Sequence, residues 1–292
     1  MRSPHNGQRI ALNDLLLLME QANQRCQAAT EDNRHGEQHP TTRKTPAGLT
    51  RNLRPTFLYL TRIDSWLSPS RFDVYATACD GNLEDALALY EWNITLGQIL
   101  LRDLSHFEIG MRNAYDAAIT NHWNGSSHWL FDESSPVRRP IMRKSRGGQL
   151  LDSNHINRKQ IDQAKNTLGS KAAADQVLSS MTLGFWTHMT DRTHERDLWI
   201  PCIHHVWPKG TNRVELHRKI QTINTLRNRV AHHEHLFNPG DTSLLPTKVD
   251  EIILHLFRQL CPEAAEWLYP VNRPTPLALF FKESAFSAQV HI

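Results

Sequence analysis

Residues 82–123 read NLEDALALYEWNITLGQILLRDLSHFEIGMRNAYDAAITNHW, a stretch with no proline and only two glycines, Gly97 and Gly110. Its first residue, Asn82, is typical of a helix N-cap, because an asparagine side chain accepts hydrogen bonds from the free N–H groups of a first turn. The stretch therefore predicts one very long helix, or two helices stacked in line. Apolar residues recur in it at steps of three and four, the spacing of a buried helix face: Leu104, Phe107, Met111, Ala114 and Ala118.

Helical patterns are also predicted on both sides of this stretch. A short helix with Pro69 just inside its start precedes it. The period-two alternation that is typical of strands is almost absent. We therefore expect an all-α fold, a helical bundle with additional helices. The later helices are expected over residues 175–189, from Arg213 to about His233 with Asn212 and Glu215 as a capping box, from Thr247 through Leu260, and as one more turn over 263–268.

The first 60 residues differ in character from the rest and are interpreted as an N-terminal extension. Residues 10–28 predict one helix, and the polar residues 31–51, with glycine and proline breakers, are typical of a flexible tether. The helical domain is then expected over residues 61–292. A basic insertion over residues 132–165 interrupts it, and its prolines and glycines predict a loop in the first part.

The composition places the chain among ordinary soluble globular proteins, with 39% apolar and 22% charged residues in a length of 292. Its longest aliphatic run, residues 15–19, is too short to span a membrane, and no secretory signal pattern precedes it. Four scattered cysteines favour reduced thiols, so a cytoplasmic location without membrane association is expected. A net charge of +3 excludes a strongly basic DNA-coating protein but leaves room for a local site that binds an anion.

Residues 224–238, NTLRNRVAHHEHLFN, contain the most informative pattern in the chain. Their predicted helix has a polar stripe opposite its apolar one, formed by Gln221, Asn224, Asn228 and His232. Arg227 follows Asn224 by three residues, so its long side chain can reach the same groove. Amides, a guanidinium and an imidazole in one row are unusual for a solvated helix surface, where lysine and glutamate are common.

These residue types favour chemistry on a phosphodiester. The guanidinium of Arg227 offers a fork of donors that matches phosphate oxygens and stabilises charge developing on them. An imidazole such as that of His232 titrates near neutrality, so it can exchange a proton with a 2′-hydroxyl or a leaving 5′-oxygen. Asn228 is expected to orient the imidazole or to bind a phosphate oxygen. A two-fold dimer would bring two such helices into one cleft.

Arg227 to His232 fits the R–x4–H signature of the HEPN ribonucleases, and the chain also resembles the bacterial Abi (abortive infection) family. The resemblance covers about residues 62–270 and rests on five segments in the family's order: LSPSRFDVY (67–75), ALALYEWN (86–93), HFEIGMRN (106–113), LGFW (183–186) and RNRVAHH (227–233). It implies a HEPN-like helical bundle, a homodimer and metal-independent cleavage of RNA that leaves a 2′,3′-cyclic phosphate. It also implies a role in phage defence or as a toxin, with an antitoxin or inhibitor as a further partner.

The resemblance assigns roles to single residues. Arg227 and His232 match the catalytic positions, and Asn228 matches the polar second position of the motif. Supporting positions that line or brace the site are predicted at Glu108, Arg112, Asn113, Asn224 and His233. Glu108 and Arg112 are also spaced as a helix ion pair, and His233 is a helix-end cap or replaces His232 as the acid.

The basic insertion offers a second candidate for contact with RNA. Arg138, Arg139, Arg143 and Lys144 can bind phosphates, or they can form an ordinary solvated loop. The extension over residues 1–60 and this insertion depart from the family's pattern, so the resemblance implies nothing about either.

Three alternatives compete with the ribonuclease hypothesis. The chain can be a non-catalytic helical module that binds RNA or a protein through the same groove, or an enzyme that modifies nucleotides, although it has no glycine-rich phosphate loop in the right context. Arg227 and His232 can also simply complement the helix dipole at a C-terminus. A zinc site that combines Cys202, His204 and His205 with the two histidines matches no standard spacing, and neither a metal nor another cofactor is expected.

Overall fold

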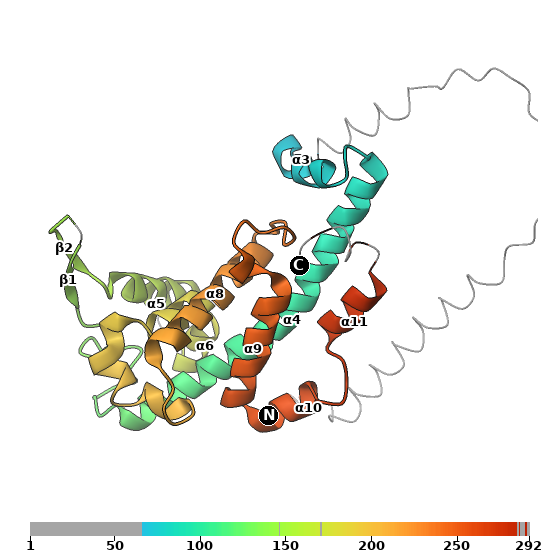
Figure 1. Cartoon of the computed structure of the whole chain (residues 1–292). Coiled ribbons are helices and arrows are strands. Elements are labelled where there is room, and N and C mark those ends of the chain that lie inside the picture. Colours follow the sequence, from blue (N-terminus) through green and yellow to red (C-terminus); the bar gives the residue numbers. More distant parts are fainter. Residues whose placement is uncertain (1–65, 146, 170, 285, 287–289, 291–292) are drawn as a thin grey trace, which may run out of the picture. The chain divides into compact units, whose positions relative to one another are not determined.

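The computed structural model describes residues 66–145, 147–169, 171–284, 286 and 290 (Figure 1). The chain divides after Leu58 into two units, and all the described residues belong to the second unit, Tyr59–Ile292. The helix predicted over residues 10–28 and the tether over 31–51 lie outside the described residues. Within them the structure is helical apart from one small hairpin, so the predicted all-α class is confirmed.

The stretch from residue 82 to 123 forms one continuous helix, α4 (Leu83–His122), which runs through the whole described unit (Figure 1). The side chain of Asn82 accepts hydrogen bonds from the backbone N–H groups of Glu84 and Asp85, as its N-cap position predicts. The single-helix alternative is thus confirmed. Since the helix contacts α3, α8, α9 and α11, it is the element against which the others pack.

The buried face of α4 departs from the predicted stripe in its second half. Leu104, Phe107 and Met111 are buried, but the buried face then continues through Tyr115 and Ile119. Ala114 and Ala118, which the pattern placed in the core, are only half-buried. The reason is tertiary, because Trp207 packs on that side of the helix and its indole N–H donates to the Tyr115 hydroxyl at 3.1 Å.

Helices from the two ends of the sequence pack against α4. The short helix α3 (Pro69–Ala78) starts with Pro69 at its first position, as predicted. Asp80 and Gly81 then turn the chain into α4 with positive φ angles of 50° and 80°. The C-terminal part supplies α9 (Pro246–Leu260), α10 (Pro262–Leu268) and α11 (Pro276–Glu283), after a short 3₁₀ turn at Thr242–Leu244.

Helix α8 (Arg213–Ala231) contains the candidate motif and packs against α4, α7 and α9. Asn212 caps it by accepting from the N–H groups of Val214 and Glu215, whereas the side chain of Glu215 forms an ion pair with Lys219 at 3.1 Å. The predicted core face of α8 is confirmed, since each of its members is buried: Leu216, Ile220, Ile223, Leu226 and Val230.

The basic insertion is more ordered than the sequence predicts. Strands β1 (Met142–Lys144) and β2 (Leu150–Asp152) form an antiparallel hairpin with Arg143 opposite Leu151, and helix α5 (His155–Leu168) follows. Buried Asn154 holds this segment in place, because its amide donates to the carbonyls of Pro136 and Arg139 and its oxygen lies 2.8 Å from His194 Nε2. The loop predicted for the first part of the insertion is therefore wrong at residues 142–144 and 150–152, which form strands.

The helix predicted over residues 175–189 is broken into two, α6 (Ala174–Ser179) and α7 (Leu183–His188). The hydroxyl of Ser180 donates to the carbonyl of Val177 at the break, the kind of local bond that competes with helix continuation. Two 3₁₀ turns at Arg192–His194 and Ile203–Val206 and a π-helical turn at Glu195–Trp199 lead to α8. No helix within the described part of the chain is long and apolar enough to cross a membrane.

Candidate active site

The end of α8 is built by backbone hydrogen bonds that place both histidines of the motif. The helix stops at Ala231, two residues before the predicted end, and His233 takes a left-handed conformation with a φ of 54°. The N–H of His233 donates to the carbonyl of Val230 at 3.1 Å, and the N–H of Glu234 donates to the carbonyl of Arg229 at 2.9 Å. This pattern is a Schellman cap, and His233 occupies the position where glycine is usual. The structure agrees with the interpretation of His233 as a helix-end residue.

The loop that follows the cap is fastened to the rest of the fold by two side chains. Asn93 of α4, only 2% exposed, donates to the carbonyl of Glu234 at 3.1 Å and accepts from the N–H of Leu236 at 2.7 Å. Arg229 donates to the carbonyl of His235 and lies 3.4 Å from the carboxylate of Glu234. The sequence pattern alone predicted neither role, although Asn93 has a detectable signal as a polar residue on the buried stripe of α4, four residues after Leu89 and three before Leu96.

Arg227 points to α4, where it meets Glu108. Its Nε lies 3.7 Å from Oε2 of Glu108, and the two side chains are 28% and 19% exposed. Burial raises the pKa of the Glu108 carboxyl, while Arg227, Arg112 and a hydrogen bond from the N–H of Leu183 act against this increase. The helix pair predicted between Glu108 and Arg112 is thus replaced by an ion pair between helices, because Arg112 donates instead to the side chain of Asn113 at 3.3 Å.

The other residues of the motif lie near solvent or against α7. Asn228 and His232 are exposed, and the N–H of His232 donates to the carbonyl of Asn228 at 2.9 Å. The carbonyl of His232 accepts from the guanidinium of Arg71 at 3.3 Å. Asn224 is half-buried beside Gly184, where an added Cβ would lie 3.8 Å from the Asn224 amide.

The other four segments that carry the family resemblance contact the C-terminal half of α8 and the loop after it, over residues 224–237, either directly or through Glu108. From residues 67–75, Arg71 binds the carbonyl of His232, and the ring of Tyr75 packs 5.5 Å from that of Phe237. Residues 86–93 and 106–113 contribute Asn93 and Glu108 through the bonds described above. Residues 183–186 contribute the N–H of Leu183 to Glu108 and place Gly184 beside Asn224.

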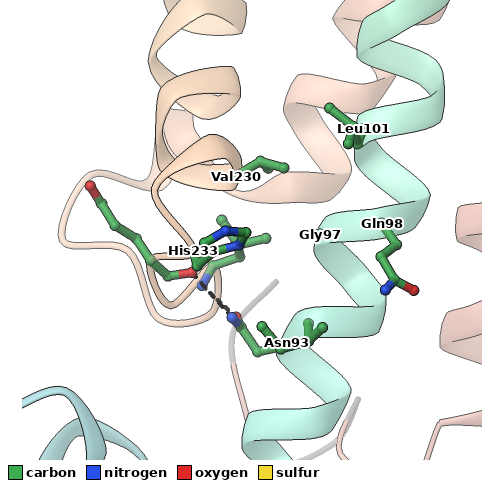
Figure 2. Close-up of a pocket in the computed structure, with 9 residues that line it drawn as sticks. Asn93, Gly97, Gln98, Leu101, Val230 and His233 are labelled. Carbon is green, nitrogen blue, oxygen red and sulfur yellow. Dashed lines mark hydrogen bonds between the residues drawn. The ribbon is translucent and has the colours of Figure 1, made fainter. Parts of the chain in front are cut away.

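A hollow of about 110 Å³ lies between α4 and the end of α8 (Figure 2). His233 and Val230 line it from α8 and its cap, and Asn93, Gly97, Gln98 and Leu101 from α4. Ile94, Glu234 and Leu236 complete its wall. The hydrogen bond from Asn93 to the Glu234 carbonyl crosses its lower part in Figure 2 and ties the two sides together.

The basic insertion presents fewer free cations than its sequence indicates. Arg138 is only 7% exposed, and its guanidinium binds both Glu133 and Asp162. This position differs from the exposed one expected for a phosphate contact. Arg139 is exposed but lies 2.7 Å from the carboxylate of Asp197. Arg143 and Lys144 are exposed on β1.

The residues considered for a zinc site have other partners. The thiol of Cys202 donates to the carbonyl of Leu198 at 3.2 Å, and Nδ1 of His204 lies 3.0 Å from the carbonyl of Trp199. Among the residues that the structure describes, no group of three or more histidine, cysteine, aspartate or glutamate side chains is arranged to hold a metal ion.

Comparison with known protein families agrees with the resemblance to the Abi family. The model of one family, described as Abi-like protein, matches residues 59–238, which include all five converging segments. No curated protein and no solved structure matches the chain significantly. Because the matched region covers more than half of the sequence, the chain belongs to the Abi-like protein family.

Proposed function

We propose that this protein is a metal-independent endoribonuclease of the HEPN type, with Arg227 and His232 as its catalytic residues. Membership of the Abi-like family suggests a role in abortive infection defence, and RNA cleavage is a direct way to exert it. The main support is that the four other family segments contact the C-terminal half of α8, which contains the motif, and the loop after it. Arg227 and His232 also remain open to solvent there, so a substrate can reach them.

The proposed reaction uses the nucleophile that RNA itself carries. The 2′-oxygen forms a bond to phosphorus, the bond from phosphorus to the 5′-oxygen breaks, and a 2′,3′-cyclic phosphate and a 5′-hydroxyl result. An imidazole takes the proton of the 2′-hydroxyl, and a second imidazole gives a proton to the 5′-oxygen. Arg227 stabilises the negative charge that develops on the phosphate oxygens.

This scheme needs two histidines in one cleft, and His232 supplies one from each chain. We therefore propose a homodimer in which two α8 ends face each other across a two-fold axis. Glu108 acts as a positioning residue, since its carboxylate at 3.7 Å limits the orientations of the Arg227 side chain. Asn228, exposed one turn before His232, has the proposed role of orienting the His232 imidazole or binding a phosphate oxygen.

The test is to incubate purified wild type, Arg227→Ala and His232→Ala with RNA in the presence of EDTA. Two matched controls are available. Arg218→Ala removes an exposed arginine nine residues earlier on α8, on the opposite face of the helix from Arg227. His255→Ala removes an exposed histidine of α9. We expect the controls to cleave like wild type and to leave 2′,3′-cyclic ends, and both motif variants to be nearly inactive.

Three other outcomes would change the assignment. Cleavage that persists in the Arg227→Ala/His232→Ala double variant would reject the proposed site. Loss of cleavage with EDTA would reject the metal-independent mechanism. Salt-sensitive RNA binding without any cleavage would favour the non-catalytic binding module.

A further inference from the structure

The hollow between α4 and the end of α8 exists because of a glycine that packing does not require. Glycine weakens a helix interior relative to alanine. At Gly110 of α4 packing explains it, because a Cβ would lie 3.0 Å from the sulfur of Cys261. At Gly97 a Cβ would lie 3.8 Å from Leu236 and 3.9 Å from Val230, which are ordinary contacts. The consequence of glycine at position 97 is therefore an open hollow.

The lining of this hollow suits a flat ring with polar edges. Ile94, Leu101 and Val230 supply apolar surface for the ring faces. His233 and the exposed amide of Gln98 supply hydrogen-bonding groups at the border, and an amide offers both donors and an acceptor. The amide nitrogen and oxygen of Asn93 already bond to the loop after α8, so Asn93 shapes the wall of the hollow but does not hydrogen-bond a ligand in it.

The size of the hollow limits what can enter. Its volume of about 110 Å³ is smaller than the engineered cavities of about 150 Å³ that hold one benzene ring. One six-membered ring can therefore insert part of the way, and the five-membered ring of a purine would have to stay outside the hollow. Among nucleobases this condition favours pyrimidines over purines, because a pyrimidine leaves no second ring to place.

We infer that the hollow holds a pyrimidine base of the RNA substrate next to the phosphate that is cleaved. This inference rests on the proposed function and adds a sequence preference to it. His233 lines the hollow and directly follows His232, so a base bound there brings its own phosphate to the end of α8. Cleavage is then favoured beside uridine or cytidine.

The test maps the cleavage sites of wild type, Gly97→Ala and Leu101→Ala on one RNA that contains every dinucleotide. Gly97→Ala narrows the hollow by one methyl group at its wall, and we expect cleavage beside pyrimidines to fall roughly tenfold. The melting temperature should stay equal or rise, because alanine favours the helix. Leu101→Ala enlarges the hollow and should raise cleavage beside purines. Gly240→Ala, which meets no atom within 4 Å, is the matched control and should cleave like wild type.

A binding measurement separates this inference from the proposed function. The His232→Ala variant is titrated with labelled octauridylate and octaadenylate, with and without Gly97→Ala. Preference for octauridylate that Gly97→Ala abolishes supports the base site, even if the wild type proves not to cleave RNA. An equal preference for all bases in wild type, or a preference that neither Gly97→Ala nor Leu101→Ala changes, would overturn the inference while leaving the nuclease proposal intact. If the protein neither cleaves nor binds these RNAs, both the base site and the nuclease proposal are overturned.

Discussion

The end of α8 and the segment 132–165 are both rich in arginine, but their guanidinium groups lie in different surroundings. Arg138 is buried and shared between two carboxylates, at 2.5 Å from Glu133 and 3.1 Å from Asp162. Arg227 is 28% exposed and has one carboxylate partner at the longer distance of 3.7 Å. A guanidinium that is saturated by short bonds braces the fold, whereas one with free donors near solvent can bind a ligand.

A cluster of arginines in a sequence therefore does not by itself indicate a surface that binds nucleic acid. The sequence of the insertion is the more basic of the two regions, yet two of its four candidate contacts have acidic partners. The end of α8 has fewer cations, but it is the place where separate segments of the family converge. Convergence is therefore better evidence for a site than charge alone.

The largest change in activity is expected when each of the two arginines, Arg227 and Arg138, is replaced by lysine. Arg227→Lys keeps the charge but loses the fork of donors, so kcat/KM for RNA cleavage should fall roughly 10²–10³-fold. The melting temperature should hardly change, since the lost ion pair is partly exposed. Arg138→Lys should do the opposite, with a lower melting temperature and unchanged kcat/KM. An activity loss in Arg138→Lys as large as in Arg227→Lys would contradict the comparison.

The next effect concerns the loop that completes the site. Asn93→Ala leaves the Glu234 carbonyl and the Leu236 N–H without their buried partner, so the free energy of unfolding should fall by about 2–3 kcal/mol. Urea denaturation measures this, and Asn121→Ala in the exposed last turn of α4 is the control that should change little. A loss no greater than that of the control would mean that Asn93 does not hold the loop.

A smaller effect is expected at the basic insertion. Arg138→Met should cost about 1–2 kcal/mol of unfolding free energy, because Glu133 and Asp162 are largely exposed and regain water. The slope of RNA affinity against salt concentration should not change, since Arg138 is not available to phosphates. Replacing Arg143 and Lys144 by alanine is the matched comparison, as both are exposed. A reduced salt slope in Arg138→Met alone would show that this guanidinium does reach RNA.

A buried acid, Asp250, differs from both arginines because its charge has no cationic partner within hydrogen-bond distance among the residues that the structure describes. Asp103 of α4 accepts from the hydroxyl of Tyr269 at 2.6 Å and from Arg102 at 2.9 Å, and it lies beside Asp250 of α9. Burial, followed by the charge of Asp103, raises the pKa of Asp250 to about 8. Between pH 4 and pH 8 the folded protein thus holds a proton that the unfolded chain has released, so stability falls as pH rises through this window.

Asp250→Asn mimics the protonated acid and should remove this pH dependence. We expect the variant to be more stable than wild type at pH 8, where wild type has lost the contribution of this proton, and to differ little from wild type at pH 4. Glu251→Gln, at an exposed acid of the same helix, is the control. A pH profile of stability for Asp250→Asn that runs parallel to that of wild type would argue against the shared proton.

The smallest effect is expected at the cap of α8. His233→Gly relieves a left-handed conformation that glycine adopts freely, so stability should rise by about 0.5–1 kcal/mol. RNA cleavage should persist if His232 is the acid–base residue, with a weaker preference for pyrimidines because the His233 ring no longer borders the hollow. An inactive but more stable His233→Gly variant would instead identify His233 as the catalytic histidine.

Local sequence patterns were enough to predict the long helix α4, the core face of α8, the N-caps at Asn82 and Asn212 and the group of motif residues. These features depend on local preferences, because a helix face, a cap and an i, i+4 spacing are set within a few neighbouring residues. Three other features follow only from the three-dimensional fold: Glu108 pairs with Arg227, Asn93 holds the loop after α8, and Arg138 is buried against Asp162. Each of these depends on groups far apart in the chain being brought within a few ångströms, and no local pattern encodes that distance.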